Sequence, residues 1–121
     1  IVIYNSSIWN LGEINDKFTL VSVDPPAFIQ SPDKVSFEKG VKAYRRAYSW
    51  SLSKASDSAI IYLSSCSYFL DRHTFLNIVH DIVYNYSEKY RILGSLVGAS
   101  PDHVTRGEEY LDYLKGAFIG I

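Results

Sequence analysis

The sequence predicts an α+β fold, with residues 1–121 forming a single domain in which a small mixed β-sheet packs with four to five helices. Short runs of β-branched and aromatic residues, at 1–4 and at Phe18–Val23, are typical of strands. A Ser-Pro-Asp sequence occurs at 31–33 and again at 100–102, and it is typical of a helix start. With 121 residues and a 47% hydrophobic composition, the chain is large enough for one core.

The N-terminal part of the chain predicts two strands separated by a short helix. Residues 1–4 form the first expected strand and Phe18–Val23 the second. Asp24-Pro25-Pro26 ends the second strand, because proline fixes φ and cannot donate a hydrogen bond to a sheet. The short helix is predicted from three apolar residues at helical spacing: Ile8, Leu11 and Ile14.

A long helix is predicted over residues 31–48. Ser31 can cap it, Pro32 suits its first position, and Asp33 favours the positive end of the helix dipole. Its apolar face is made by four residues spaced four, three and four apart: Phe37, Val41, Tyr44 and Tyr48. A second, apolar helix is predicted over 59–65.

The second half of the chain contains one segment whose structure the pattern leaves open. Residues 75–97 carry apolar side chains at helical spacing and predict one long helix, whereas the β-prone composition of 81–87 allows a strand there. Gly98 ends this element. A capping box at 105–108 then begins a last helix that extends to Phe118.

Nothing in the sequence matches the residue pattern of a catalytic centre. The single cysteine, Cys66, excludes a disulfide within the chain and a cysteine cluster for a metal. The three histidines match no metal-binding spacing, and glycine-rich phosphate loops are absent. We therefore expect no catalytic residue, no metal and no cofactor. One enzyme alternative stays open, in which folding brings Cys66 together with a histidine.

Charge and composition limit the cellular location and the binding partners that we expect. A net charge of −1 provides no overall field for nucleic acid, and no run approaches the roughly 20 apolar residues of a membrane span. One cysteine fits a reducing, cytoplasmic location. The chain begins at Ile1 rather than methionine and ends on an apolar sequence, so we expect the protein to continue at one or both ends.

Binding is the function that remains, and the feature that best supports it is a basic stripe made of Lys39, Lys42, Arg45, Arg46 and Arg72. Tyr44, Tyr48 and Trp50 alternate with the stripe and could stack on unpaired bases. The alternative is a solvated helix face whose aromatic rings turn into the core. The side chains of the basic stripe could contact the phosphates of a nucleic acid.

In its order of elements the chain resembles the small kinase-binding subunit of the KEOPS (EKC) complex, the PRPK-binding protein family. Residues 17–21 leading into Asp24-Pro25 are similar to that family's strand and aspartate turn, and 59–65 to its apolar helix ending in Leu-Ser. The resemblance implies a strand at 81–87 and helices at 88–97 and 108–118. The chain departs from the family at 66–71, where a glycine turn is missing, and it lacks the family's C-terminal segment.

This resemblance implies a non-catalytic accessory subunit. The family binds the small kinase/ATPase subunit of KEOPS and helps to hold tRNA during threonylcarbamoyl-adenosine synthesis. The expected kinase contact is the apolar patch of Tyr68, Phe69 and Leu70, and the basic stripe is the expected tRNA contact. The alternative is a helical accessory subunit of a replication or viral assembly, which an unbroken helix over 75–97 would favour.

Overall fold

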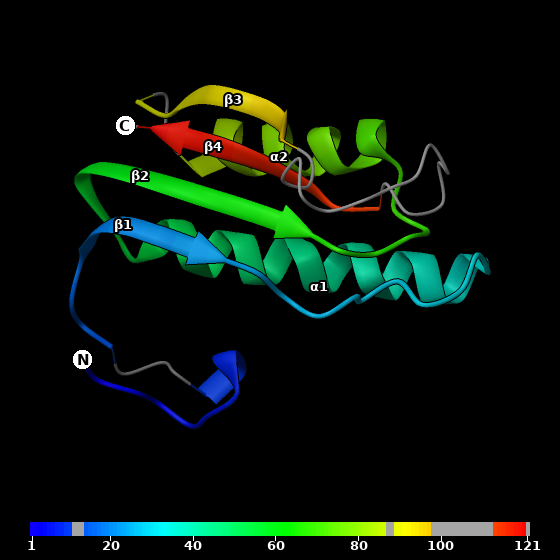
Figure 1. Cartoon of the computed structure of the whole chain (residues 1–121), viewed down its shortest axis with the longest axis horizontal. Helices are drawn as coiled ribbons and strands as arrows, with labels where there is room; N and C mark the ends of the chain where they lie inside the picture. Colours follow the sequence, from blue (N-terminus) through cyan, green and yellow to red (C-terminus); the bar gives the residue numbers. More distant parts are fainter. Residues whose placement is uncertain (11–13, 87–88, 98–112, 121) are drawn as a thin grey trace, which may run out of the picture.

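A computed structural model describes residues 1–10, 14–86, 89–97 and 113–120 of the chain (Figure 1). A 3-10 helix, η1 (Ile8–Asn10), precedes the sheet. The strands and α-helices follow in the order β1 (Phe18–Val23), α1 (Lys34–Ser53), β2 (Ala55–Ser65), α2 (Arg72–Tyr86), β3 (Arg91–Val97) and β4 (Lys115–Gly120).

The four strands form one mixed sheet in the order β1-β2-β4-β3. β1 and β2 are parallel, with Leu20 opposite Ile60 and Val23 opposite Leu63, and β4 is antiparallel to both β2 and β3. α1 therefore connects the parallel strands β1 and β2, and α2 connects β2 to β3. Because such crossovers are right-handed and both run in the same direction across the sheet, the two helices lie on one face of it (Figure 1).

The core lies between the two helices and the sheet. This is visible in β2, where Ile61 and Leu63 are fully buried whereas Ile60, directly before them, is 47% exposed, as expected when one face of a strand is covered. On the uncovered face the rings of Tyr62 and Phe118 lie 4.8 Å apart. The largest helix residues in the core are Tyr44, Tyr48, Leu52, Phe75, Ile78 and Val79.

Each helix begins at an aspartate cap. Asp33 accepts a hydrogen bond from the Ser36 N–H at 2.9 Å, and Asp71 accepts one from the Thr74 N–H at 2.8 Å. These bonds satisfy N–H groups that have no partner within the helix. The predicted start of the first long helix is thus displaced from Ser31 to Asp33, while Ser31 itself donates to the Asp33 carboxylate.

Among the N-terminal predictions, the strand over Phe18–Val23 is confirmed with the same bounds. The predicted strand at 1–4 is wrong, because these exposed residues belong to none of the described strands. An apolar, β-prone run forms a strand only where it finds a pairing partner and a surface to pack on. Of the predicted helix through Ile8, Leu11 and Ile14, only η1 is seen, and residues 11–13 lie outside the described part.

The predicted apolar helix at 59–65 is wrong, because this segment is the second half of β2. Its Ile-Ile-Tyr-Leu sequence is β-branched and aromatic, and a strand paired on both sides carries a nearly continuous apolar run that periodicity cannot distinguish from a buried helix.

The open segment at 75–97 resolves into two elements rather than one. α2 extends to Tyr86, and β3 follows from Arg91. A strand at 81–87 is contradicted, because residues 81–86 belong to α2, and the implied helix at 88–97 is contradicted by β3. The last predicted helix does not extend to Phe118, which lies in β4, and its expected start at 105–108 lies outside the described residues.

The predicted fold class is therefore wrong in its helices. The described residues contain two α-helices around a four-stranded mixed sheet, not four to five helices. Three of the predicted helical segments turn out to be strands wholly or in part. Among the helices described, none is both long enough and apolar enough to cross a membrane.

Candidate active site

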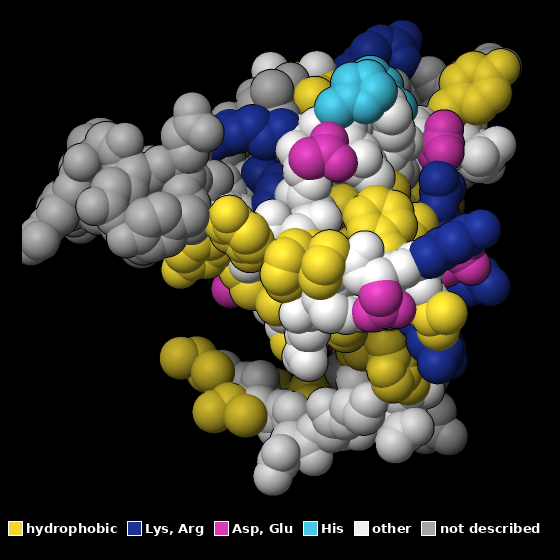
Figure 2. All heavy atoms as spheres, turned by 90° about the vertical axis from the view of Figure 1, so that its right-hand side faces the viewer, with side chains coloured by type: hydrophobic (Ala, Val, Ile, Leu, Met, Phe, Trp, Pro, Cys, Tyr) yellow, Lys and Arg dark blue, Asp and Glu magenta, His cyan; other side chains and the backbone are white. Residues whose placement is uncertain are grey.

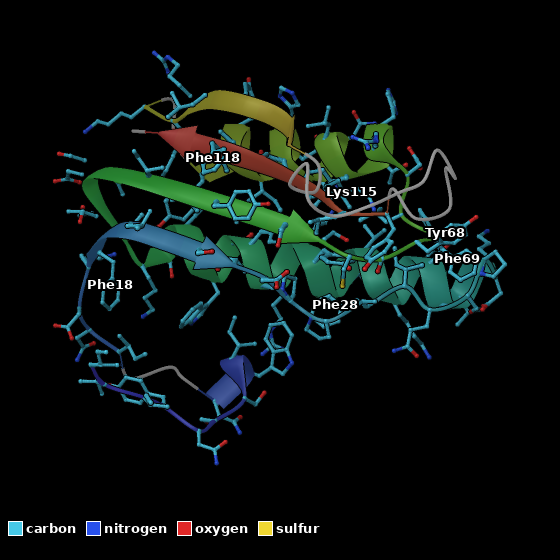
Figure 3. The ribbon with its side chains drawn as sticks, in the orientation of Figure 1. Phe18, Phe28, Tyr68, Phe69, Lys115 and Phe118 are labelled. Atoms are coloured by element: carbon cyan, nitrogen blue, oxygen red, sulfur yellow. The ribbon has the colours of Figure 1, made fainter. Side chains whose placement is uncertain are left out.

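Two loops meet at the carboxyl ends of β1 and β2. β1 ends at Val23 and continues into Asp24-Pro25-Pro26, while β2 ends at Ser65 and continues into Cys66 and Ser67. In open α/β sheets, ligands bind beyond the carboxyl ends of parallel strands. Figure 3 shows Phe28 beyond the end of β1, at the opposite end of the strand from Phe18. The 24–29 loop and the 64–67 loop, the second of which includes the last two residues of β2, therefore form the candidate site.

Asp24 is held at this edge by the neighbouring strand. The Ser64 hydroxyl lies 2.8 Å from Asp24 Oδ1 and 3.0 Å from the Val23 carbonyl oxygen. Ser64 is in turn fixed through its carbonyl, which accepts a 2.7 Å hydrogen bond from the buried Tyr48 hydroxyl. Burial raises the pKa of Tyr48, so this hydroxyl keeps its proton for the bond. Asp24 thus remains solvent-exposed but has a defined position.

The Tyr44 hydroxyl contacts both loops. This α1 residue is fully buried, and its hydroxyl lies 2.8 Å from Ser65 Oγ and 2.7 Å from Ser67 Oγ. The same hydroxyl donates toward the Pro26 carbonyl at 3.4 Å and lies 3.4 Å from the Phe28 N–H. One buried oxygen therefore contacts both the 24–29 loop and the 64–67 loop.

The two serines complete this hydroxyl cluster. Ser67 Oγ accepts a 3.2 Å hydrogen bond from the Ile29 N–H, and Ser65 Oγ accepts one of 3.2 Å from the Ser67 N–H. Both serines are fully buried, so each hydroxyl must find partners within the protein. Lys115, 3% exposed, adds a third strand to the cluster by donating to the Ser67 carbonyl at 2.8 Å.

A cavity opens beside Asp24. It has a volume of about 460 Å³ and lies between β1, α1 and η1. Phe28 and Trp50 contribute aromatic surface to it, and Trp9 closes it from η1, with its ring centroid 6.4 Å from that of Phe28. The cavity is thus mainly apolar, with the Asp24 carboxylate among its polar groups.

The predicted basic stripe is partly brought together. Lys39, Lys42 and Arg46 follow at helical spacing on α1 and are exposed. Arg45 instead pairs with Asp81 of α2, with Nη2 and Oδ2 2.6 Å apart, and Arg46 lies 4.3 Å from the centre of the Trp9 ring. Arg72 lies apart from them, at the start of α2. Figure 2 shows this end of the molecule, where Lys and Arg side chains lie along the upper and right-hand sides of the view, with Asp and Glu among them, and hydrophobic side chains lie nearer the centre.

Two of the three aromatic residues interleaved with the stripe cannot stack on bases. Tyr44 and Tyr48 are fully buried in the core, as the alternative interpretation held for these two rings. Trp50 is half-buried and lines the cavity beside Asp24.

The predicted partner patch is divided between surface and core. Tyr68 and Phe69 are exposed, with ring centroids 5.3 Å apart, and lie together beyond the end of β2 (Figure 3). Leu70 is fully buried in the core cluster, where a docking partner would not reach its side chain.

Among the described residues, no hydrogen bond of the kind that the small-enzyme alternative requires joins Cys66 to a histidine. Cys66 Sγ lies 3.9 Å from the Pro25 carbonyl oxygen, at the junction of the two loops. His73 contacts Asn77 on the surface of α2, and His103 lies outside the described residues. In the described ranges, no group of three or more potential metal ligands gathers.

Sequence reasoning missed the main residues of this site. Asp24 was interpreted as a turn residue, Tyr44 as one of an apolar face, and Ser64 and Ser65 as the end of a helix. The signal that could have located them is Asp-Pro-Pro directly after a predicted strand, combined with a Ser-rich sequence after a second apolar run. Reading that second run as a parallel strand would have placed both at one sheet edge.

Comparison with known proteins relates the chain to methyltransferases. It is 31% identical over 107 residues to a protein of Methanocaldococcus jannaschii that is provisionally named a ribosomal RNA large subunit methyltransferase. The match covers 88% of this chain but 26% of that relative, so the chain spans about a quarter of the curated protein's length. No family model matches the chain.

Two solved structures share the fold. One is described as a methyltransferase, provisionally named, complexed with SAH, and it superposes with a TM-score of 0.64 at 19% identity, covering 88% of this chain and 27% of its own. The other is described as a SAM-dependent methyltransferase from Streptococcus mutans, also provisional, with a TM-score of 0.63 at 19% identity, covering 88% and 26%.

These comparisons contradict the KEOPS resemblance. The prediction of a kinase-binding, tRNA-holding accessory subunit is wrong, as is the prediction of a non-catalytic protein, because the similar proteins are named methyltransferases. The helical replication or viral subunit is not supported either, since a four-stranded sheet is present. The KEOPS resemblance rested on an order of elements that the structure contradicts at 1–4, 59–65 and 81–97. By sequence and by fold, the chain is similar to a quarter-length portion of methyltransferases.

Proposed function

We propose that this chain forms part of the catalytic domain of a methyltransferase that uses S-adenosylmethionine (SAM) and acts on RNA. The observation that carries the proposal is the pair of cross-braced loops at the carboxyl ends of β1 and β2, which hold Asp24 beside a cavity. The RNA relationship of the curated relative and the fold of the two structures support it.

The residues around the cavity fit a methyl donor of this class. SAM combines an adenine ring with a positively charged sulfur and an amino group, and it supplies a methyl group that is bonded to that sulfur. The aromatic surfaces of Phe28 and Trp50 suit the ring, and the Asp24 carboxylate suits a cationic group. A volume of about 460 Å³ also lies within the range of small-molecule sites.

The residues of this chain would hold a carboxylate in a fixed position beside the bound methyl donor. Ser64 orients Asp24, and the rigid Pro25-Pro26 sequence keeps the following backbone in one conformation. A carboxylate that is held in place stabilises a neighbouring cation without the cost of reorganising solvent. Preorganised groups of this kind are what a transfer between two bound molecules requires.

RNA would approach over the amino-terminal half of α1. α1 runs antiparallel to β1 and β2, and Gly40 packs against the backbone of Phe28, so this half of the helix lies next to the candidate site. Lys39 and Lys42 are exposed here, and Arg46 is exposed one turn further along the helix. These three side chains would contact phosphates, which position an RNA without reading its sequence. Arg45 and Arg72 remain weaker candidates, because Arg45 already pairs with Asp81.

The test is methyl transfer from radiolabelled SAM to ribosomal RNA, measured on the protein purified at its natural length. We expect transfer by the wild type and a loss of about 100-fold in Asp24→Ala, the size typical of a lost electrostatic group in an active site. Asp57→Ala is the matched control, since Asp57 is an exposed aspartate near the amino end of β2. A wild type that labels no RNA, or an Asp24→Ala variant as active as Asp57→Ala, would refute the proposal.

A further inference from the structure

The Tyr44 hydroxyl cluster has no counterpart in the function proposed so far. Tyr44, Ser65 and Ser67 are all fully buried polar residues, and burying three hydroxyls is unfavourable unless each is hydrogen-bonded. None of them is needed to fill a core, where an apolar side chain of similar volume would serve. Their placement under the two loops points to a role in the loops themselves.

The hydrogen bonds of the cluster form a closed set. A tyrosine hydroxyl has one proton to donate and two lone pairs to accept with. Tyr44 can donate to the Pro26 carbonyl while accepting from Ser65 and Ser67. Ser65 and Ser67 then each use their own oxygen to accept a backbone N–H, from Ser67 and Ile29 respectively. In this arrangement each of the three buried hydroxyls has a hydrogen-bond partner within the protein.

The hydrogen bonds of Tyr44 hold the two loops in a fixed position relative to each other. Pro26 and Ile29 belong to the loop after β1, whereas Ser65 ends β2 and Ser67 lies in the loop that follows it, and the Tyr44 hydroxyl contacts both segments. Tyr44 lies in the middle of α1, a rigid element that packs on both strands. Moving either loop by one ångström would break bonds of 2.7–2.8 Å to the same oxygen.

We propose that Tyr44, with Ser65 and Ser67, is a positioning residue that sets the distance between the 24–29 loop and the 64–67 loop for methyl transfer. This inference rests on the proposed function for its catalytic consequence. The geometric part, that one buried hydroxyl locks two loops, stands on the contacts alone. Tyr44 itself does not need to touch the substrate.

The experiment compares Tyr44→Phe with Tyr90→Phe in the protein at its natural length. Tyr90 is the matched control, a mostly buried tyrosine whose hydroxyl lies 3.4 Å from the Leu52 carbonyl, near the end of α1 that is remote from the loops. We expect Tyr44→Phe to lower kcat by tenfold or more with the KM for RNA changed less than about twofold, because misplacement by an ångström acts on the transition state. Tyr90→Phe should retain the wild-type kcat.

Cys66 supplies a readout that does not depend on activity. It is the only cysteine of the chain and lies between Ser65 and Ser67, so its alkylation rate reports on the loop they form. We expect faster labelling in Tyr44→Phe and in Ser67→Ala, and no further loss of kcat in the double variant, because both changes remove one interaction. Tyr90→Phe should label at the wild-type rate.

The outcomes separate this inference from the proposed function. Equal kcat and equal Cys66 labelling in Tyr44→Phe and Tyr90→Phe would overturn the positioning role. An additive loss in the double variant would overturn the single-cluster arrangement. If the wild type transfers no methyl group, the proposed function and the catalytic part of this inference both fail, and the labelling rates still decide whether Tyr44 locks the loops.

Discussion

Asp71 shows how much one surface side chain contributes to the start of α2. Its carboxylate accepts hydrogen bonds from the Thr74 N–H at 2.8 Å and from the Thr74 hydroxyl at 2.5 Å. Burial alone would raise the pKa of Asp71, but hydrogen bonds, first those from Thr74 and then backbone bonds at His73 and Asp71, outweigh it, and the pKa lies below its ordinary value. The charged carboxylate is therefore the form that stabilises the folded state.

Replacing this cap should cost stability in a pH-dependent way. We expect Asp71→Ala to lower the free energy of unfolding by about 1 kcal/mol at pH 7, the typical loss for an N-cap. Because the folded-state pKa is lowered, the stabilisation is complete above about pH 5 and is lost as the pH falls through that pKa. Denaturant unfolding at several pH values measures this, and a deficit that does not shrink in acid would contradict it.

The residue scale is also where the sequence was most reliable. The Ser31-Pro32-Asp33 pattern located the start of α1 to within three residues, because cap chemistry is local. The same local reasoning could not find Tyr44 or Ser67, since the partners of their hydroxyls lie 16 to 38 positions away in the chain. A site built from long-range contacts has no local signature, and its chemistry becomes visible only when the strands are paired.

At the scale of elements, α1 is pressed directly against the loop that carries the site. A Cβ added at Gly40 would lie 2.3 Å from Ile29 Cγ1 and 2.9 Å from the Phe28 carbonyl oxygen. Real Cβ atoms do not approach so closely, so glycine is what permits the helix and the loop to touch. The packing of α1 and the position of Phe28 are therefore linked.

Gly40→Ala should accordingly destabilise the protein although alanine favours helix by about 1 kcal/mol over glycine. We expect a net loss of about 1–3 kcal/mol in the free energy of unfolding, because the carbonyl of Phe28 is backbone and must move. Gly94→Ala is the control, since nothing lies within 4 Å of a Cβ there. Thermal or denaturant unfolding of both variants decides the point, and a Gly40→Ala variant more stable than wild type would disprove the contact.

The elements also explain which parts of the fold the sequence could predict. Phe18–Val23 was predicted correctly because Asp24-Pro25-Pro26 marks its end unmistakably. β2 and β3 were predicted as helix because a strand in the middle of a sheet, or one carrying bulges, loses the two-residue alternation that identifies strands. The KEOPS resemblance then followed from these wrong elements, since it was built on their order.

For the molecule as a whole, the amino-terminal half of α1 combines positive charge with nearness to the candidate site. Lys39 and Lys42 test this most cleanly, because they are exposed, whereas Arg45 also joins α1 to α2 through Asp81 and Arg46 packs on Trp9. Removing either arginine would change the packing along with the charge.

Neutralising both lysines, as Lys39→Gln with Lys42→Gln, should weaken RNA binding and flatten its salt dependence. Each lost phosphate contact lowers the slope of log affinity against log salt concentration by about 0.7 for a single strand, so we expect a decrease of about 1.4. Lys17→Gln with Lys89→Gln is the matched control, because both lysines line a cavity near the amino end of β2, at the opposite edge of the sheet. Filter binding to ribosomal RNA at a series of salt concentrations measures both slopes. Equal slopes in the two double variants would place the RNA on another surface and leave the candidate site without its proposed approach.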